Sequence, residues 1–274
     1  MRSGYDRPGY QETIKKGKAH ITVQDVTMAY GSYVVMNDIN FTINRGEIFV
    51  VMGGSGCGKS TLMKIMLGLK PPETGQVFYD EVNFWESGQK ARNEILKHIG
   101  ILYQRGALWS SMSLAENVAL PLEEHTNLGP SQIREIVSFK LSLVGLAGFE
   151  RLYPSELSGG MIKRAALARA MALDPDILFF DEPSAGLDPV SARQLDDLIL
   201  ELRESLQTTV VVVSHELESI LAIGDNSIFL DADAKTMIAS GNPRTLLDTC
   251  KDSRVFEFLT RGKTCSGRNR GETI

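Results

Sequence analysis

The sequence of 274 residues contains no long uninterrupted apolar run. No stretch of about 18 apolar residues occurs, so we predict no helix that crosses a membrane. The first 18 residues are polar and lack the apolar centre of a secretory signal peptide, so we expect none here. Internal repeats and low-complexity tracts are also missing from the sequence, which gives no sign of a repeat or fibrous architecture.

Cysteine is scarce, and basic residues are not in excess. Cys57, Cys250 and Cys265 are an odd number and do not have the spacing of metal ligands. We therefore predict a protein of the reducing cytosol. The formal net charge is −5 and no basic stripe is concentrated along the chain, so we expect no nucleic-acid partner. The other proportions, 43% hydrophobic and 23% charged residues, are ordinary for a globular protein.

What the sequence does contain is a phosphate-binding loop with the pattern G-x-x-x-x-G-K-[ST]. Its residues are Gly53, Gly54, Ser55, Gly56, Cys57, Gly58, Lys59, Ser60 and Thr61. The apolar run 48–52 predicts a buried strand before the loop, and residues 62–67 predict a helix after it. Glycines let backbone N–H groups turn toward phosphate oxygens, and the helix N-terminus adds partial positive charge. The pattern predicts that Lys59 reaches the β- and γ-phosphates and that the Ser60 hydroxyl faces Mg²⁺.

Two further apolar runs end in polar residues that can do chemistry. Residues 177–180 are followed by Asp181 and Glu182, which predicts a buried parallel strand with carboxylates at its C-terminal end, where ligands bind in α/β sheets. Together with the phosphate loop, this strand predicts a nucleoside triphosphatase. Residues 210–213 precede His215. An isolated histidine is more often structural, but the order of the motifs favours a catalytic one.

The order and spacing of these motifs resemble the ABC-type ATPases over roughly residues 19–248. The additional matching positions are Tyr30, Gln104, the segment 157–161 and the segment 185–188. The resemblance implies an α/β P-loop NTPase fold with a mixed central sheet and flanking helices, an N-terminal antiparallel β subdomain and an inserted helical subdomain. No N-K-x-D motif for guanine is present, which disfavours a GTPase.

The expected domain boundaries follow from this resemblance and from composition. We expect a flexible arm at residues 1–18 and an ATPase domain at 19–250. The helical subdomain would occupy about 105–165. A C-terminal extension would follow at 251–274, and we expect its end to be disordered.

The resemblance implies a role in nucleotide binding for several positions. Tyr30 would stack on adenine, and residues 53–60 would hold the phosphates of ATP, with Thr61 near the α-phosphate. Ser60 and Gln104 would ligate Mg²⁺, and Asp181 would hold the metal through water. Taken alone, Tyr30 would more often be a packing residue and Gln104 would be uninformative.

It also implies the residues of hydrolysis and of a dimer interface. Glu182 would be the general base for the attacking water, and His215 would contact the γ-phosphate. Ser158, Gly159 and Gly160 would contact the ATP of a second copy, with Asp188 at the dimer seam. Met161 departs from the usual Gln, and a thioether cannot replace the hydrogen bonds of an amide. Cys57 in the phosphate loop predicts sensitivity to thiol reagents.

Within this family, the segments 104–109, 116–126 and 157–170 resemble the ATPase of the Mla/Mce phospholipid transporters, which maintain outer-membrane lipid asymmetry. That resemblance implies a homodimer on the cytoplasmic face of the inner membrane. Its partners would be an integral permease, an MCE-domain lipid-binding protein and, in some systems, a small STAS-domain protein. Residues 254–259 resemble the C-terminal region of that family, which can reach neighbouring subunits.

The helical insertion and the loop after Gln104 would form a groove for a cytoplasmic helix of the permease. We expect Trp109, Leu114, Val118 and Leu120 to be divided between this groove and the core of the helical subdomain.

Three other functions stay open on the sequence alone. The chain could be the ATPase of another ABC transporter, for amino-acid import or lipoprotein release. It could be an ABC ATPase acting on nucleic acid or the ribosome, although it lacks a second ATPase unit and a long coiled-coil insertion. The last alternative is a switch that binds nucleotide without hydrolysing it, and the presence of Glu182 and His215 argues against it.

Overall fold

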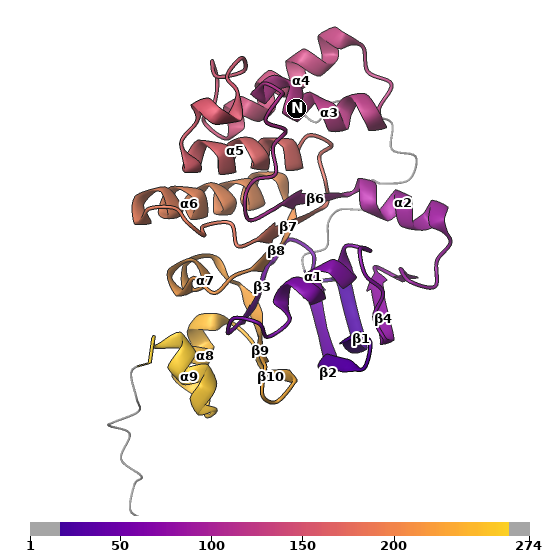
Figure 1. The fold of residues 1–274 in the computed structure, drawn as a ribbon, viewed down its shortest axis with the longest axis vertical. Helices are drawn as coiled ribbons and strands as arrows, with labels where there is room; N and C mark the ends of the chain where they lie inside the picture. Colours follow the sequence, from indigo (N-terminus) through magenta and orange to yellow (C-terminus); the bar gives the residue numbers. More distant parts are fainter. Residues whose placement is uncertain (1–16, 263–274) are drawn as a thin grey trace, which may run out of the picture.

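The computed structural model describes residues 17–262 (Figure 1). The expected flexible arm lies outside these residues except for positions 17 and 18, and so does the expected disordered end from 263 onward. Among the described residues, no helix has both the length and the apolar character needed to cross a membrane.

The N-terminal part of the chain forms a four-stranded antiparallel sheet in the order β2-β1-β4-β5. Its strands are β1 (Ala19–Tyr30), β2 (Tyr33–Asn44), β4 (Thr74–Tyr79) and β5 (Val82–Asn83). Ile21, Val23 and Val26 are buried, so one face of this sheet packs on the core. This arrangement confirms the N-terminal antiparallel subdomain that the resemblance implies.

The central sheet has six strands in the order β10-β9-β3-β8-β7-β6. They are β3 (Ile48–Gly53), β6 (Ile99–Leu102), β7 (Ile177–Asp181), β8 (Thr209–Val213), β9 (Asn226–Asp231) and β10 (Thr236–Ser240). All neighbouring pairs are parallel except β10 with β9, so the sheet is mixed as predicted. The continuous apolar runs of β3, β7 and β8 suit strands that are covered on both faces.

Helices cover the two faces of this sheet. They are α1 (Lys59–Met66), α2 (Gln89–Lys97), α6 (Pro189–Leu206), α7 (Leu217–Ile223), α8 (Pro243–Thr249) and α9 (Ser253–Leu259). Because side chains alternate along a strand, Phe49 and Val51 share a core with α1 and the antiparallel sheet. Val50 and Met52 point the other way, into the core that α6 to α9 complete (Figure 1).

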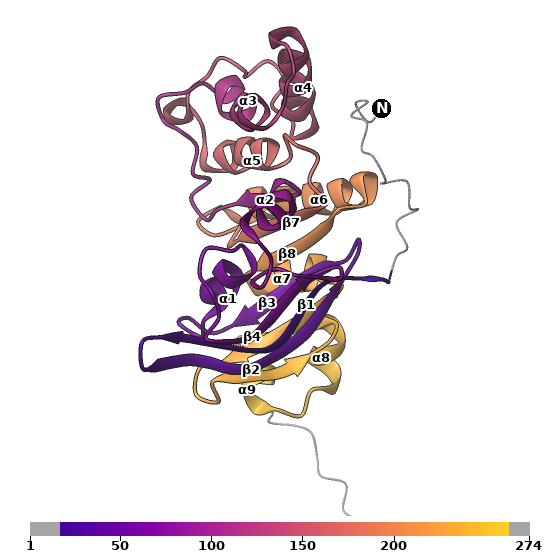
Figure 2. The same ribbon diagram turned by 90° about the vertical axis from the view of Figure 1, so that its right-hand side faces the viewer.

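The inserted helices lie at one end of the molecule, and the antiparallel sheet lies toward the other end (Figure 2). They are α3 (Leu114–His125), α4 (Pro130–Leu143), the 3-10 turn η1 (Pro154–Glu156) and α5 (Gly159–Ala170). A capping box between Ser113 and Glu116 begins α3. Leu114 and Val118 are fully buried in this subdomain, Leu120 is half-buried and Trp109 is exposed. The core part of the prediction is therefore confirmed for Leu114 and Val118, and the groove stays a prediction.

Candidate active site

The phosphate loop joins the end of β3 to the start of α1. Gly53 has φ 148°, and a Cβ there would clash with the carbonyl oxygen of Leu230 and the sulfur of Cys57. Gly58 has φ 95°, and a Cβ there would lie 2.9 Å from the Val35 side chain. Both positions therefore require glycine, which has no Cβ and tolerates positive φ.

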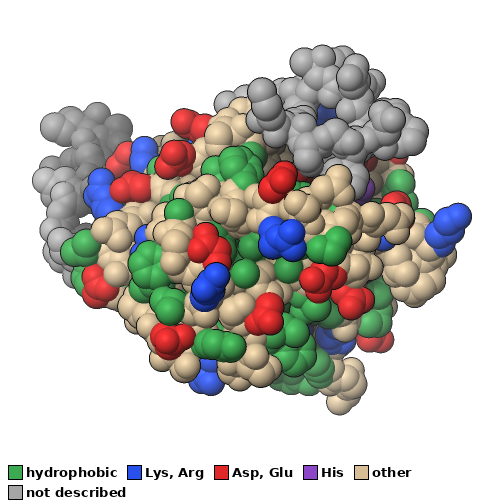
Figure 3. Space-filling model, turned by 90° about the horizontal axis from the view of Figure 1, so that it is seen from above, with side chains coloured by type: hydrophobic (Ala, Val, Ile, Leu, Met, Phe, Trp, Pro, Cys, Tyr) green, Lys and Arg blue, Asp and Glu red, His purple; other side chains and the backbone are tan. Residues whose placement is uncertain are grey.

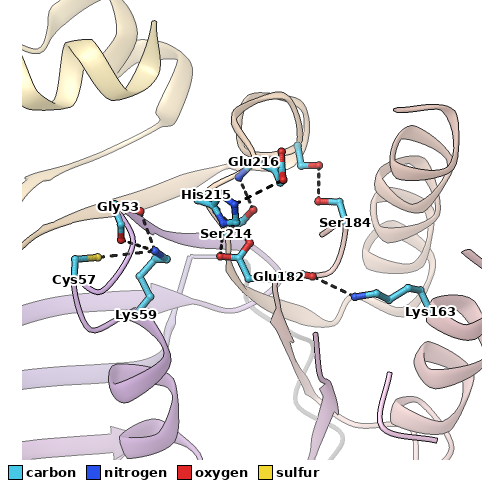
Figure 4. Close-up of polar contacts among 11 residues, drawn as sticks. Gly53, Cys57, Lys59, Lys163, Glu182, Ser184, Ser214, His215 and Glu216 are labelled. Atoms are coloured by element: carbon cyan, nitrogen blue, oxygen red, sulfur yellow. Dashed lines mark hydrogen bonds and ion pairs between the residues drawn. The ribbon is translucent and has the colours of Figure 1, made fainter. Parts of the chain in front are cut away.

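The loop and helix α1 offer positive charge and free donors to an anion. Gly58 is the N-cap of α1 and supplies no side-chain cap. The first-turn N–H groups therefore have no side-chain acceptor at the cap, which suits a phosphate. Lys59 is buried, and its Nζ donates to the carbonyl oxygens of Gly53 at 2.9 Å and Gly54 at 2.8 Å (Figure 4). The ammonium therefore already lies against the loop that would hold the phosphates.

Cys57 faces the interior of the loop instead of solvent. It is 1% exposed, and its sulfur lies 4.0 Å from the Lys59 Nζ. Burial raises the pKa of the thiol, although the Lys59 charge opposes this shift. Since the thiolate is the reactive form, the predicted sensitivity to thiol reagents does not fit this geometry.

The order of the strands brings the three polar strand ends together. Val213 of β8 pairs with Val51 of β3 on one side and with Asp181 of β7 on the other. The chain leaves β8 through Ser214 and His215, so His215 lies between the phosphate loop and Glu182 (Figure 4). Parallel strands place these carboxyl ends at one edge of the sheet.

Asp181 and Glu182 differ in burial and in backbone shape. Burial raises the pKa of the Asp181 carboxyl, the Glu182 charge adds to this effect, and nearby lysines, Lys64 first, oppose it. Glu182 has φ 49°, a left-handed conformation that residues other than glycine rarely adopt. Its N–H donates to the Val213 carbonyl oxygen at 2.8 Å, which holds the peptide in place.

The Glu182 carboxylate is fixed by His215. The Nδ1 of His215 lies 2.7 Å from Oε1 of Glu182, a hydrogen bond that the ring N–H donates to the carboxylate. The backbone N–H of His215 also donates to Oε2 at 3.3 Å. The imidazole is 53% exposed and the carboxylate only 11%, so the ring covers the carboxylate and presents its other edge to solvent.

Gln104 follows β6, the strand beside β7, and its side chain is exposed. Helix α5 holds the loop that begins there. Lys163 donates to the Gln104 carbonyl oxygen, and Arg169 donates to those of Gly106 at 3.0 Å and Ala107 at 2.7 Å. Asn117 then bonds both the N–H and the carbonyl of Trp109. The backbone of this loop is therefore held at several points.

Ser158 and the two following glycines lie at the start of α5, on a different element from the phosphate loop. The Ser158 hydroxyl caps α5 by accepting the Met161 N–H at 3.3 Å. A Cβ at Gly160 would touch Ser191 at 3.6 Å. The structure therefore does not join this segment to the phosphate loop of the same chain; Figures 1 and 2 show α5 and α1 well apart.

Asp188 has a structural task in this chain. Its Oδ1 accepts the N–H groups of Val190 and Ser191, each at 3.0 Å, and so caps α6. Hydrogen bonds from Ser191 lower the pKa of its carboxyl. The residue is exposed, which leaves it accessible to a second copy.

Tyr30 ends β1 on the outer side of the phosphate loop. Its ring is half exposed, and its hydroxyl lies 3.5 Å from the Thr61 Oγ1. The Nζ of Lys70 lies 4.6 Å from the ring centroid, a cation–π contact. An exposed aromatic ring beside the loop is a suitable surface for a nucleotide base.

The comparisons with known proteins identify this arrangement. A family model described as ABC transporter matches residues 36–185. The chain belongs to the ABC transporter family. It is 44% identical to the intermembrane phospholipid transport system ATP-binding protein MlaF of Haemophilus influenzae, over 87% of this chain and 89% of that protein. It is 41% identical to MlaF of Escherichia coli K12, over 87% and 88%. It is also 42% identical to a probable ribonucleotide transport ATP-binding protein of Mycobacterium tuberculosis, over 87% of this chain and 66% of that protein.

Solved ABC ATPases have the same fold. CbiO1 of Clostridium perfringens, part of a transporter complex, has a TM-score of 0.78 at 27% identity, covering 89% of this chain and 97% of that one. The cassette MJ0796, solved as a dimer bound to ADP and phosphate, has a TM-score of 0.73 at 29% identity, covering 81% and 98%. The chain is therefore an ATP-binding, ATP-hydrolysing subunit of an ABC transporter, as the motifs predict.

The donor set of this ABC ATPase fits a metal held jointly with phosphate. Among residues 17–262, no group of three or more His, Cys, Asp or Glu side chains could hold a metal ion. The predicted ligands Ser60, Gln104 and Asp181 supply one hydroxyl, one amide and one carboxylate, all oxygen donors. Mg²⁺ is commonly bound in this way, by one or two protein oxygens together with substrate phosphates.

The sequence alone predicts no role for three residues that hold the backbone near the ABC ATPase site. Lys163, Arg169 and Asn117 all bond to backbone carbonyls of the segment that follows β6. A lysine, an arginine and an asparagine within helices read as solvent-facing residues, and no local pattern marks them as buried.

Proposed function

We propose that this ABC ATPase powers the movement of phospholipid between the inner and outer membranes and acts as a homodimer. The observation that carries the proposal is the 44% identity, over nearly the whole length of both chains, to an ATPase named for intermembrane phospholipid transport. The other named substrate class among these relatives, ribonucleotides, belongs to a protein of which this chain spans only 66%.

ATP binding is assigned to the phosphate loop and Tyr30. The N–H groups of residues 53–61 and the start of α1 would surround the β- and γ-phosphates, with Thr61 near the α-phosphate. Lys59 would exchange its bonds to the Gly53 and Gly54 carbonyls for phosphate oxygens. Tyr30 would stack on adenine through its exposed ring.

Mg²⁺ would be held by Ser60 and Gln104, with Asp181 acting through water. Bound there, the ion would neutralise charge on the phosphates. The raised pKa of Asp181 fits a carboxylate that lacks a strong protein partner and gains one when a cation is present.

Hydrolysis is assigned to Glu182 and His215. The carboxylate would orient and deprotonate the attacking water, which requires a base within one water of the γ-phosphorus. His215 already fixes that carboxylate through its Nδ1, and its exposed edge would contact the γ-phosphate. The contact between these two residues, which follow β7 and β8, supports this assignment.

A homodimer would complete the site. Ser158, Gly159 and Gly160 start α5 away from their own phosphate loop, so they would act on the ATP of a second copy. Asp188, exposed at the start of α6, would lie at the seam. A dimeric cassette with the same fold supports this assembly. Met161 would contact the opposite nucleotide more weakly than the amide it replaces.

The permease would dock beside the loop that follows Gln104. A groove of about 570 Å³ lies between the β6 edge and the inserted helices, and its lining includes Tyr103, His125 and Arg169. Figure 3 views the end that carries α3 and α4, where apolar side chains lie among acidic and basic ones.

The proposed partners are the permease, an MCE-domain lipid-binding protein and, in some systems, a small STAS-domain protein. The ATPase would lie on the cytoplasmic face of the inner membrane.

A detergent pull-down from native membranes tests this proposal. The tagged protein and its Glu182→Gln variant are purified in parallel, and the partners are identified by mass spectrometry. We expect a permease together with an MCE-domain protein. A permease recovered with a solute-binding protein for amino acids or nucleotides would overturn the phospholipid assignment, and recovery of ribosomes would overturn transport altogether.

A further inference from the structure

Lys163 occupies a buried position from which its ammonium contacts two parts of the candidate active site. It lies on α5, five residues after Ser158, and is 5% exposed. Its Nζ donates to the carbonyl oxygen of Gln104 and, at 3.3 Å, to that of Glu182 (Figure 4). Burying an ammonium is unfavourable, and an apolar side chain of similar size often stabilises a fold better. The position therefore calls for an explanation other than packing.

The contact with Glu182 fixes a backbone that would not hold its shape alone. At φ 49°, this residue is in the left-handed region, which persists only where surrounding bonds determine it. Val213 accepts the N–H of Glu182, and the Glu182 carbonyl accepts from Lys163 and from the Ala185 N–H at 3.2 Å. These bonds hold the peptide groups on either side of Cα, and so they set the direction of the carboxylate.

The same ammonium relates Glu182 to Gln104. These residues follow the neighbouring strands β7 and β6, whose paired residues end at Leu102 and Phe180. One cation that bonds both carbonyls fixes the distance between the two segments. Burial lowers the pKa of the Lys163 ammonium, while the charges of Asp181 and Glu182 oppose this shift and favour the charged form.

We propose that Lys163 is a positioning residue for ATP hydrolysis, which holds the backbones of Gln104 and Glu182 in the geometry that turnover needs. The inference rests on the roles proposed above for these two residues. Because α5 also begins with Ser158, Lys163 would connect the segment that meets the second copy's ATP to the groups that act on the chain's own ATP. The two nucleotide sites of a dimer would then be linked through one buried ammonium.

Three variants of the full-length protein test the proposal. Lys163→Met keeps the length of the side chain and removes its charge, and Lys163→Arg keeps the charge. Lys140→Met is the matched control, because Lys140 on α4 is also buried but pairs with Asp174, which follows α5, away from the site. Steady-state phosphate release gives kcat and KM, a fluorescent ATP analogue gives the nucleotide Kd, and thermal unfolding gives Tm.

We expect Lys163→Met to lower kcat about 10- to 100-fold, the size of loss that small misplacement of reacting groups causes. Its nucleotide Kd should stay within about twofold of the parent value, and its Tm should fall no further than that of Lys140→Met, since each substitution removes one buried ammonium. Lys163→Arg should recover most of kcat because it can still donate to both carbonyls. Lys140→Met should lower Tm to a similar extent but leave kcat unchanged.

Glu182→Gln, measured beside these variants, distinguishes a failure of the Lys163 positioning role from a failure of the proposed catalytic site. A Lys163→Met protein with parental kcat, while Glu182→Gln abolishes turnover, would overturn the positioning role and leave the proposed site intact. Turnover retained by Glu182→Gln would instead overturn the site assignment. If Lys163→Met does not fold, Lys163→Gln takes its place, and a folded Lys163→Gln protein with parental kcat also overturns the proposal.

Discussion

The Oε1 of Glu182 and the Nδ1 of His215 lie 2.7 Å apart, although 33 positions separate the residues in the chain. The contact exists because β8 lies beside β7, so that both residues leave the sheet at the same edge. This hydrogen bond fixes the orientation of the carboxylate, and so it fixes the direction from which the carboxylate can bind a water molecule.

Replacing Glu182 by Gln should abolish ATP hydrolysis and preserve ATP binding. The amide keeps the size of the side chain and its acceptor oxygen, but it cannot take a proton from water. We expect kcat to fall more than about 100-fold in a phosphate-release assay. Glu216→Gln is the control, because that carboxylate lies 3.8 Å from the other ring nitrogen of His215 and has no assigned chemistry. Equal losses in both variants would contradict the role of Glu182.

Removing the imidazole of His215 should lower kcat about 10- to 1000-fold and change Tm little, since the ring is more than half exposed. The reason is the lost orientation of the Glu182 carboxylate. His98 provides the matched control, because it is partly exposed and its Nδ1 lies 3.2 Å from the Asp176 carboxylate, away from the site. His98→Ala should therefore keep the parental kcat. An active His215→Ala protein would show that Glu182 is held without the ring.

Replacing Tyr30 by Ala should weaken ATP binding, while Tyr30→Trp should preserve it. Stacking of a base on an aromatic ring contributes about 1–3 kcal/mol. The expected result is a Kd raised about 5- to 100-fold for Ala, measured by fluorescence with an ATP analogue. Tyr33→Ala is the control, since Tyr33 is a similarly exposed ring on β2. The parent protein is also compared for its affinity toward nucleotides with adenine and with other bases. A difference in the parent that disappears in Tyr30→Ala would further support contact between the ring and the base.

The stability of the fold should fall in mild acid because of His20. This residue is buried, and its pKa is lowered from 6.5 to about 4, mainly by burial. The backbone N–H of Gly46 donates to Thr209 Oγ1, so the hydroxyl can donate to the neutral Nδ1 of His20 at 2.7 Å. The unfolded chain takes up the proton near pH 6.5 and the folded chain only near pH 4. The free energy of unfolding should therefore drop by about 3 kcal/mol as pH falls through this window.

Denaturant unfolding at several pH values measures this effect, with His20→Gln as the reference. The comparison is needed because Asp196 acts in the opposite direction. Burial raises its pKa from 3.8 to about 6, so its protonation favours the folded state as pH falls. The difference between parent and His20→Gln removes this second contribution. Parallel pH profiles for the two proteins would show that His20 does not carry the dependence.

Cys57 should react slowly with thiol reagents in the native protein, in contrast to the expectation from its place in the loop. Its thiol is buried and its pKa is raised, whereas Cys250 is only half-buried. Labelling with a disulfide reagent followed by peptide mass spectrometry should show Cys250 modified before Cys57, and Cys57 at a comparable rate only after unfolding. Rapid native labelling of Cys57 would mean that the loop opens frequently.

Sequence patterns predicted the elements that bear long apolar runs, and they failed where burial is small. β3, β7 and β8 were recognisable because both of their faces are covered. Helix α2 was missed because it is short and rich in polar and charged residues, none of which is buried. Helix α7 was missed because seven residues are too few to establish a period.

The chemistry of the site was predictable residue by residue, but its spatial arrangement was not. The phosphate loop and Glu182 each stand out by type and context. That β8 lies between their strands, so that His215 meets Glu182, depends on strand order, which hydropathy does not encode. Lys163 could not be found at all, because its importance comes from two carbonyl oxygens far away in sequence.

The left-handed backbone of Glu182 has a consequence for attempts to improve the protein in the laboratory. A residue of this type in that conformation costs on the order of 1–3 kcal/mol, a penalty that glycine does not carry. Screening a mutant library for heat resistance alone would therefore favour losing the carboxylate. Substitutions that raise the thermal stability of the ATPase should therefore be chosen at other positions, and ATP turnover should be measured in every round of selection.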